Sequence, residues 1–305
     1  VYCEKLKMFF LDCQQRFDMN YWKLDGFLVR PPQPDPQGNY ISGGYQGMCY
    51  VTEHWERWID IFQAMRDQRG AKRNDLWINL TCYVNPSPWF LQWGNSVWMQ
   101  NSQDIGRLNV KRPSQLDQLL SYRDDRYFDF VKTRAFQFPL AHLYNHDPIY
   151  GNTANLAGKM DDDEFRTYLM MMATRGSAFW ELYYSYNMMN EGQKWVINAD
   201  VLHWINDNYE TLKHAKLIGQ TPAKGTPYGY SAWSGQEGII SVRNPSDEVK
   251  EFTFPLDRTI GMPEGLKGLH RTYVWAYRTD EQKAEDTENH LFDYGGQISL
   301  SLQPG

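Results

Sequence analysis

Apolar, strand-like runs alternate with amphipathic helical runs over the first two thirds of the chain, and this alternation limits the possible folds more than any other feature. Polar residues gather at the carboxyl end of each expected strand. Strands are expected at 21–29, 76–84, 96–104, 136–147 and 176–185, and helices at 1–17, 52–68, 125–136 and 161–175, with Thr52 as a candidate N-cap. This order predicts an α/β fold with a parallel sheet.

A (β/α)8 TIM barrel is the parallel fold in which the carboxyl ends of all strands carry the active site. The visible units cover roughly 220 residues, fewer than the about 250 of a full barrel. We therefore expect residues 1–225 to be the C-terminal part of a barrel, strands four to eight, with the remainder supplied by upstream sequence. From residue 226 to 305 the pattern changes to short alternating strands, which predict a small all-β sandwich. The Pro- and Gly-rich segment 221–229 marks the expected boundary.

Charge and cysteine content exclude several classes of partner. The formal net charge of −6 comes from intermixed acids and bases, so neither nucleic acid nor an anionic membrane is an expected partner. No apolar run approaches the roughly 20 residues of a membrane span. Four cysteines without a CxxC pair predict free thiols and no metal site. The informative excess is aromatic, 15% of residues, because sugar-binding clefts use flat aromatic faces.

Asp25 is the most suggestive acid in the sequence. It ends an apolar strand and is followed by a glycine, and a period of two places it on the same face as Lys23. A cation beside a carboxylate favours the ionised form that a nucleophile needs. The alternative is a strand-end aspartate that only caps the following loop.

A second carboxyl group is expected at the tip of another strand, and Asp104 lies there. Retaining glycosidases need two carboxyl groups about 5–5.5 Å apart, one to attack the anomeric carbon and one to protonate the leaving oxygen. Strands in two β/α units can bring Asp25 and Asp104 together although about eighty residues separate them. Asp124 and Asp125 are alternative acids for the second role.

Other strand ends and loops offer residues for sugar binding. His146 and Asp147 end an expected strand and are candidate partners for sugar hydroxyl groups. His142 and His146 do not form a helical metal pair if this segment is a strand. Trp89 and Trp93 could stack on a sugar or pack on the barrel. Glu181 is expected to be buried and hydrogen-bonded in the barrel, and the alternative is a ligand for a sugar hydroxyl group.

The order of these motifs resembles the clan of retaining α-galactosidases and α-N-acetylgalactosaminidases, glycoside hydrolase family 36 and its relatives in family 31. Those enzymes place a Lys-x-Asp nucleophile on barrel strand four, which is similar to Lys23 to Asp25. A strand that ends in a cysteine follows, similar to Cys82, and then a Trp-containing strand that ends in the acid/base, similar to Trp98 through Asp104.

The resemblance continues through residues 130–146, 176–185 and the C-terminal β-sandwich, so it spans nearly the whole chain. Two motifs differ. A Gly-Gly-Gly-Arg stretch of the family is replaced by 85–89 in this chain, and its Trp-x-Ser-Asp motif is replaced by 98–104. An ungapped match would place Asn101 at the acid position, so Asp104 is assigned with a small shift in the loop.

The resemblance implies a retaining glycoside hydrolase that releases terminal α-linked galactose or N-acetylgalactosamine from an oligosaccharide or glycoconjugate. Asp25 is then the nucleophile and Asp104 the acid/base, with no cofactor.

Alternatives are a degenerate carbohydrate-binding protein and a transglycosylase on the same barrel. A homo-oligomer is compatible with the sequence. The compartment stays open between secreted, periplasmic and cytoplasmic, since any signal would precede Val1. The pocket residues implied are Trp22, Lys23, Asn79, Cys82, Asn85, Trp89, Trp93, His146 and Asp147.

Overall fold

A computed structural model of the chain describes residues 1–26, 33–39, 47–70, 73–81, 86–99, 102–103, 106–108, 115–152, 160–177, 179–275 and 291–305. The chain forms two compact units, Val1–Gln100 and Asn101–Gly305. The boundary expected near residue 225 therefore falls inside the second unit, and the separate β-sandwich domain stays a prediction.

The first unit combines helices with three short parallel strands. Strand β1 pairs with β2, and β2 pairs with β3, both in parallel. The elements in chain order are α1 (Tyr2–Phe17), β1 (Tyr21–Asp25), α2 (Met48–Gly70), β2 (Trp77–Thr81), the 3-10 helix η2 (Pro88–Gln92) and β3 (Ser96–Trp98). Parallel strands separated by helices confirm the α/β expectation for this unit.

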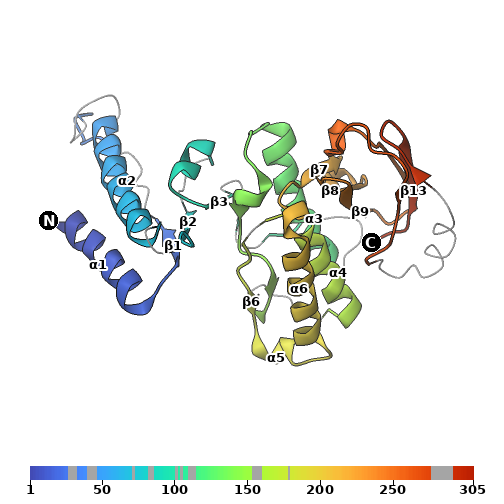
Figure 1. The fold of residues 1–305 in the computed structure, drawn as a ribbon, viewed down its shortest axis with the longest axis horizontal. Helices are drawn as coiled ribbons and strands as arrows, with labels where there is room; N and C mark the ends of the chain where they lie inside the picture. Colours follow the sequence, from blue (N-terminus) through green and yellow to red (C-terminus); the bar gives the residue numbers. More distant parts are fainter. Residues whose placement is uncertain are drawn as a thin grey trace. The chain divides into compact units, whose positions relative to one another are not determined.

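The two long helices of the first unit lie side by side (Figure 1). Gln14 on α1 donates to the backbone oxygen of Met65 on α2 over 3.1 Å, and the rings of Phe10 and Trp22 meet edge to face at 4.7 Å. The helix expected from residue 52 begins earlier, at Met48. Thr52 is therefore not its N-cap, and its hydroxyl donates instead to the Met48 carbonyl within the helix.

The N-terminal part of the second unit is mainly helical. Helices α4 and α6 pack against each other, and Arg166 pairs with Asp200 between them. Strands β5 and β6 are a short parallel pair. The elements are α3 (Gln115–Phe128), the π-helical turn η3 (Asp129–Thr133), η4 (Leu140–His142), β4 (Leu143–Tyr144), β5 (Ile149–Tyr150), α4 (Asp162–Ala173), β6 (Tyr183–Tyr184), α5 (Tyr186–Met189) and α6 (Lys194–Leu212).

Antiparallel strands make up the C-terminal part of the second unit. Strands β7, β8 and β9 form one sheet, β10 pairs with β13, and β11 with β12. Trp233, Phe252 and Ile298 belong to one apolar core shared by these strands. The elements are β7 (Lys216–Gly219), η6 (Pro222–Lys224), β8 (Tyr228–Ser234), β9 (Glu237–Arg243), β10 (Lys250–Pro255), η7 (Arg258–Ile260), β11 (Leu269–His270), β12 (Leu291–Phe292) and β13 (Gln297–Leu302).

Several expected strands are shorter than their sequence patterns. Residues 136–147 contain a 3-10 turn before the two-residue strand β4, and 176–185 contribute only β6. Within the region expected to form short alternating strands, residues 271–275 have no regular structure. Helix α6 was not expected at all. None of the helices in the described segments is long and apolar enough to cross a bilayer.

Candidate functional site

The carboxyl ends of β1 and β2 place polar side chains next to one another. Lys23 is in register with Asn79, and Asp25 with Thr81. The alternation of strand side chains puts these four residues on one face of the sheet. Asp25 is exposed, whereas Asn79 and Thr81 are buried. An exposed carboxylate at the open end of a parallel pair is where a substrate can reach it.

Asn79 is held by its neighbours on this face. Ser96 on β3 donates to Asn79 Oδ1 over 2.7 Å, and Asn79 Nδ2 lies 3.4 Å from the Tyr21 hydroxyl. The Trp77 indole donates to Ser96 Oγ over 3.2 Å. These bonds tie the three strands together just below the end that carries Asp25.

The three tryptophans expected near a sugar have different surroundings. Trp22 lies on the opposite face of β1 from Asp25 and packs on Phe10 of α1. Trp89 and Trp93 on and after η2 meet at 4.7 Å, and Trp89 also contacts Trp55 of α2 at 5.1 Å. Trp89 is nevertheless 42% exposed, so part of this side chain is accessible to solvent.

Two buried arginines hold Asp147 in the second unit. Arg123 on α3 donates from Nε to Asp147 Oδ2 over 3.0 Å, and Arg175, just after α4, donates from Nη1 to the same oxygen over 3.1 Å. The Asp147 side chain is 14% exposed. A carboxylate fixed through one oxygen in this way can accept a further hydrogen bond through the other.

The same arginine connects Asp147 to the residues that precede Asp104. Arg123 Nη1 donates to the Gln103 carbonyl over 3.0 Å and to the Ser102 hydroxyl, and the Tyr122 hydroxyl accepts from the Gln103 amide over 2.8 Å. Helix α3 therefore anchors both Asp147 and the segment that leads to the expected acid/base.

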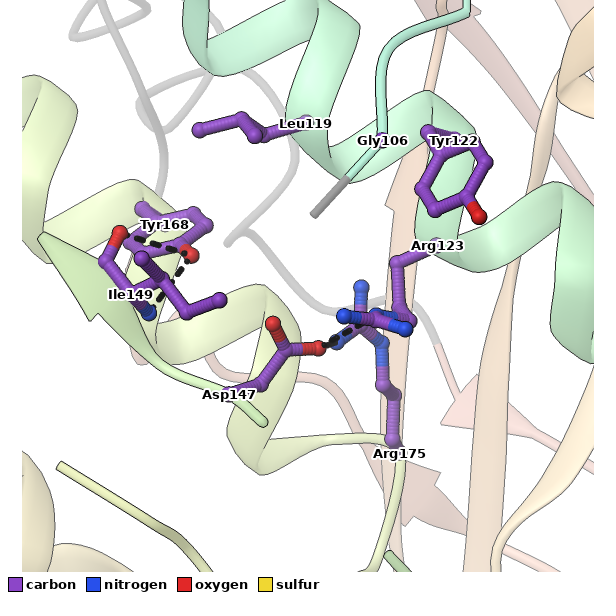
Figure 2. Close-up of a pocket in the computed structure, with 8 residues that line it drawn as sticks. All are labelled: Gly106, Leu119, Tyr122, Arg123, Asp147, Ile149, Tyr168 and Arg175. Carbon is purple, nitrogen blue, oxygen red and sulfur yellow. Dashed lines mark hydrogen bonds and ion pairs between the residues drawn. The ribbon is translucent and has the colours of Figure 1, made fainter. Parts of the chain in front are cut away.

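Asp147 and Arg175 line two adjoining cavities. Figure 2 shows the first, where one Asp147 oxygen meets the guanidinium groups and the other points away from them. Its lining consists of Gly106, Leu119, Tyr122, Arg123, Asp147, Ile149, Tyr168 and Arg175. The second is lined by Tyr127, Asn145, Asp147, Met172, Arg175, Ser177, Phe179 and Trp180. Both linings combine aromatic rings with a few polar groups.

Asp124 is fully buried and is bonded to Arg175, the arginine that also holds Asp147. It accepts from Arg175 Nε over 2.7 Å, from the Tyr228 hydroxyl over 2.6 Å and from the Tyr230 hydroxyl over 2.7 Å. Burial, together with the Asp124 charge, raises the pKa of both tyrosines, so they stay protonated donors. Burial alone lowers the pKa of Arg175, but Asp124, Tyr230 and Asp147 outweigh it, and the net pKa lies well above the ordinary value.

A second ion pair continues this network into β9. Arg243 donates to Asp117 Oδ1 over 2.6 Å, to the Tyr228 hydroxyl over 2.9 Å and to Ser121 Oγ over 3.0 Å. All of these groups are buried. The C-terminal sheet is thus bonded to α3 through paired charges rather than through apolar contact alone.

His146 belongs to a separate cluster with Glu181. His146 Nδ1 is hydrogen-bonded to Glu181 Oε2, to which the Tyr183 hydroxyl also donates over 3.1 Å. The His146 and Tyr183 rings meet edge to face at 5.0 Å. A carboxylate on Nδ1 favours the tautomer that carries a proton there, and this fixes the role of Nε2. The Glu181 side chain is 9% exposed, in agreement with its expected burial.

Three expected site residues, Cys82, Asn85 and Asp104, lie outside the described residues. Of the two alternative acids, Asp124 has all its surface covered, and Asp125 accepts from the Thr221 hydroxyl over 2.6 Å and pairs with Arg126. Both serve contacts within the protein. Among the described residues, no group of three or more His, Cys, Asp or Glu side chains is arranged to hold a metal ion.

Solved structures with a similar fold are glycoside hydrolases. The chain aligns with a family 36 α-galactosidase from Geobacillus stearothermophilus, in complex with 1-deoxygalactonojirimycin, at a TM-score of 0.54 and 8% identity, over 98% of this chain and 37% of that one. AmyP in complex with maltose gives a TM-score of 0.50 and 10% identity, over 98% and 66%. The chain therefore has a glycoside hydrolase type of fold and spans about a third to two thirds of these proteins.

No protein-family model matches the sequence, and no curated protein matches it significantly. The likeness consequently concerns the fold.

Sequence reasoning missed the arginines that organise the site. Arg175 follows the apolar run 169–173 at the end of α4, where a charge needs a buried partner, and that context is a signal the sequence offered. Arg123 lies in a charged stretch of α3, 123–126, and gives no such signal. Nothing in the sequence pointed to the tyrosines of β8.

Proposed function

We propose that this chain is the catalytic portion of a retaining glycoside hydrolase that releases terminal α-linked galactose or N-acetylgalactosamine. The observation that carries the proposal is the exposed Asp25 carboxylate at the carboxyl end of β1, in register with Thr81, in a fold that resembles an α-galactosidase. The (β/α)8 barrel, strands four to eight in this chain, is part of the same proposal.

In the first step an Asp25 oxygen attacks the anomeric carbon of the sugar. The bond between that carbon and the leaving oxygen breaks, and Asp104 gives its proton to the leaving oxygen. In the second step Asp104 takes a proton from water, the water oxygen bonds to the anomeric carbon, and Asp25 is released. The anomeric configuration is inverted twice and so retained.

The surroundings of both acids support these roles. Lys23 lies on the same face of β1 as Asp25. Arg123 holds the backbone at Gln103, next to Asp104, and Asp147 at the same time. Asp124 and Asp125 are engaged inside the protein, which supports Asp104 over them as the acid/base. Asp147 and His146 are then hydroxyl partners of the sugar.

Kinetics on aryl α-galactosides and aryl α-N-acetylgalactosaminides, with the complete protein that contains this chain, test the proposal. The Asp25→Ala variant should lose about three or more orders of magnitude in kcat, since the covalent route is removed. Asp12→Asn, a change of an exposed acid on α1, is the control and should keep wild-type rates.

Azide supplied to the Asp25→Ala variant should restore turnover of an activated aryl glycoside and give a β-glycosyl azide, because the small anion attacks from the face that Asp25 vacates. Wild-type product should appear first as the α-anomer by NMR. Full activity in Asp25→Ala, or a β-anomer as first product, contradicts the proposal. Sugar binding by calorimetry without hydrolysis would instead indicate a carbohydrate-binding protein.

A further inference from the structure

A continuous series of hydrogen bonds runs from the C-terminal sheet to Asp147. Tyr228 and Tyr230 on β8 donate to Asp124, Asp124 accepts from Arg175, and Arg175 donates to Asp147. We call these five residues the Asp124 relay. Every distance in it lies between 2.6 and 3.1 Å, and all its members except Asp147 are less than 4% exposed.

Two polar atoms at the end of the Asp124 relay have no partner within the described part of the chain. Arg175 Nη2 is buried and makes no hydrogen bond. Asp147 uses Oδ2 for both arginines, and its Oδ1 has no bond there. Arg175 and Asp147 both line the two cavities (Figure 2). A buried guanidinium N–H without an acceptor is costly, so an oxygen atom from outside the chain is the expected occupant.

We propose that Asp147 Oδ1 and Arg175 Nη2 form an acceptor and donor pair for two neighbouring hydroxyl groups of a pyranose, and that Tyr228 and Tyr230 are positioning residues for this pair. One hydroxyl donates to the carboxylate and the next accepts from the guanidinium. The inference rests on the sugar-binding part of the proposed function. It adds the specificity-determining contact and assigns a role in substrate binding to the C-terminal sheet.

The tyrosines act at a distance from the sugar. Each of them gives Asp124 one hydrogen bond, so replacing both by phenylalanine leaves Arg175 as the only donor to Asp124 that the structure describes. Arg175 is then free to shift toward either carboxylate, and Asp147 shifts with it. Binding sites of this kind tolerate displacements of only about 0.5 Å. The rings stay in place, so the sheet keeps its packing.

The test compares Tyr228→Phe/Tyr230→Phe with Tyr184→Phe in the complete protein. Tyr184 is a matched control, because its hydroxyl donates a single 2.8 Å bond to Asn198 of α6, away from the Asp124 relay. Dissociation constants for methyl α-galactoside and methyl α-N-acetylgalactosaminide are measured by calorimetry, together with kcat and KM on aryl glycosides. Thermal unfolding of all variants is recorded.

The double variant should raise the dissociation constant and KM about tenfold, as expected when one or two hydrogen bonds are misaligned, with kcat changed less than about threefold. Tyr184→Phe should stay within about twofold of wild type in both. A dissociation constant for the double variant that equals that of the control, at a similar loss of thermal stability, overturns the inference.

Deoxygenated ligands give a second measurement. Its result would not change if Tyr228 and Tyr230 only stabilised the fold. Of the monodeoxy methyl α-galactosides, those that lack a hydroxyl contacted by the pair should bind wild type about tenfold more weakly than the parent sugar, and this loss should largely disappear in the double variant. An unchanged loss contradicts the inference. Sugar binding without hydrolysis defeats the hydrolase proposal but leaves these comparisons valid, whereas wild type that binds no sugar defeats both.

Discussion

Removing the Asp124 carboxylate should be among the most damaging single changes in the second unit. Asp124→Ala takes one charge from a buried Arg–Asp pair with a 2.7 Å bond, which costs about 3–5 kcal/mol in comparable pairs. It also takes the acceptor from two buried tyrosine hydroxyls, at about 1 kcal/mol or more each unless they find new partners. Because these losses overlap, we expect about 5 kcal/mol. For a unit of about 200 residues this lowers Tm by about 10–20 °C.

Urea denaturation followed by circular dichroism and tryptophan fluorescence measures this loss. Asp200→Ala is the matched control, because it also removes the acid of an Arg–Asp pair between helices, but one whose carboxylate is 53% exposed. Exposed pairs contribute about 0–1 kcal/mol, so the control should be nearly neutral. If the two variants lose the same stability, or Asp124→Ala loses less than about 1 kcal/mol, the reasoning on burial is refuted.

Three further predictions concern separate parts of the chain. Asp104→Ala should slow substrates with poor leaving groups far more than activated aryl glycosides in the first step, which a plot of log kcat/KM against leaving-group pKa measures; equal losses mean that Asp104 is not the acid. Burial raises the pKa of Tyr127 to about 12 in the folded protein, whereas the unfolded value is near 10. Between these pH values mainly the unfolded state releases this proton, so stability falls as pH rises, by about 2 kcal/mol at pH 12. Denaturation at pH 9 to 12 should show this slope in wild type and a smaller one in Tyr127→Phe. Gly229→Ala should disrupt β8, because a Cβ would lie 1.8 Å from the Ser241 backbone oxygen, whereas Gly70→Ala in α2 meets nothing within 4 Å and should be neutral or slightly stabilising by thermal melts.

The parts of the fold that follow local periodicity could be predicted from the sequence. The helices around residues 2–17 and 162–173, and the strands that begin at Tyr21 and Trp77, have apolar faces whose spacing is set by their own geometry. The strand prediction for the segment around Pro139 was wrong over most of its length. Its apolar residues form a 3-10 turn and a two-residue strand, which are too short to show a period. Helix α6 is mixed in polarity and gave no clear face.

The candidate site also has residues that could be predicted from the sequence and residues that could not. Acids at strand ends, such as Asp25 and Asp147, can be proposed from sequence because position along a strand is local. Partners such as Arg175 and Tyr230 come from other elements, and their pairing depends on tertiary contact between residues far apart in sequence. A single sequence contains no record of such contacts.

The charged pairs that join α3 to β8 and β9 have a consequence for recombining this chain with its relatives. Tyr228, Tyr230 and Arg243 satisfy Asp124 and Asp117 on the helix, so a chimera that exchanged only the C-terminal strands would need all three of these side chains in the incoming segment. A donor sheet with leucine or phenylalanine at these positions would pack well, but Asp124 would lose two of its hydrogen bonds and Asp117 would lose its bond from Arg243. Successful crossovers should therefore keep the five positions from a single parent.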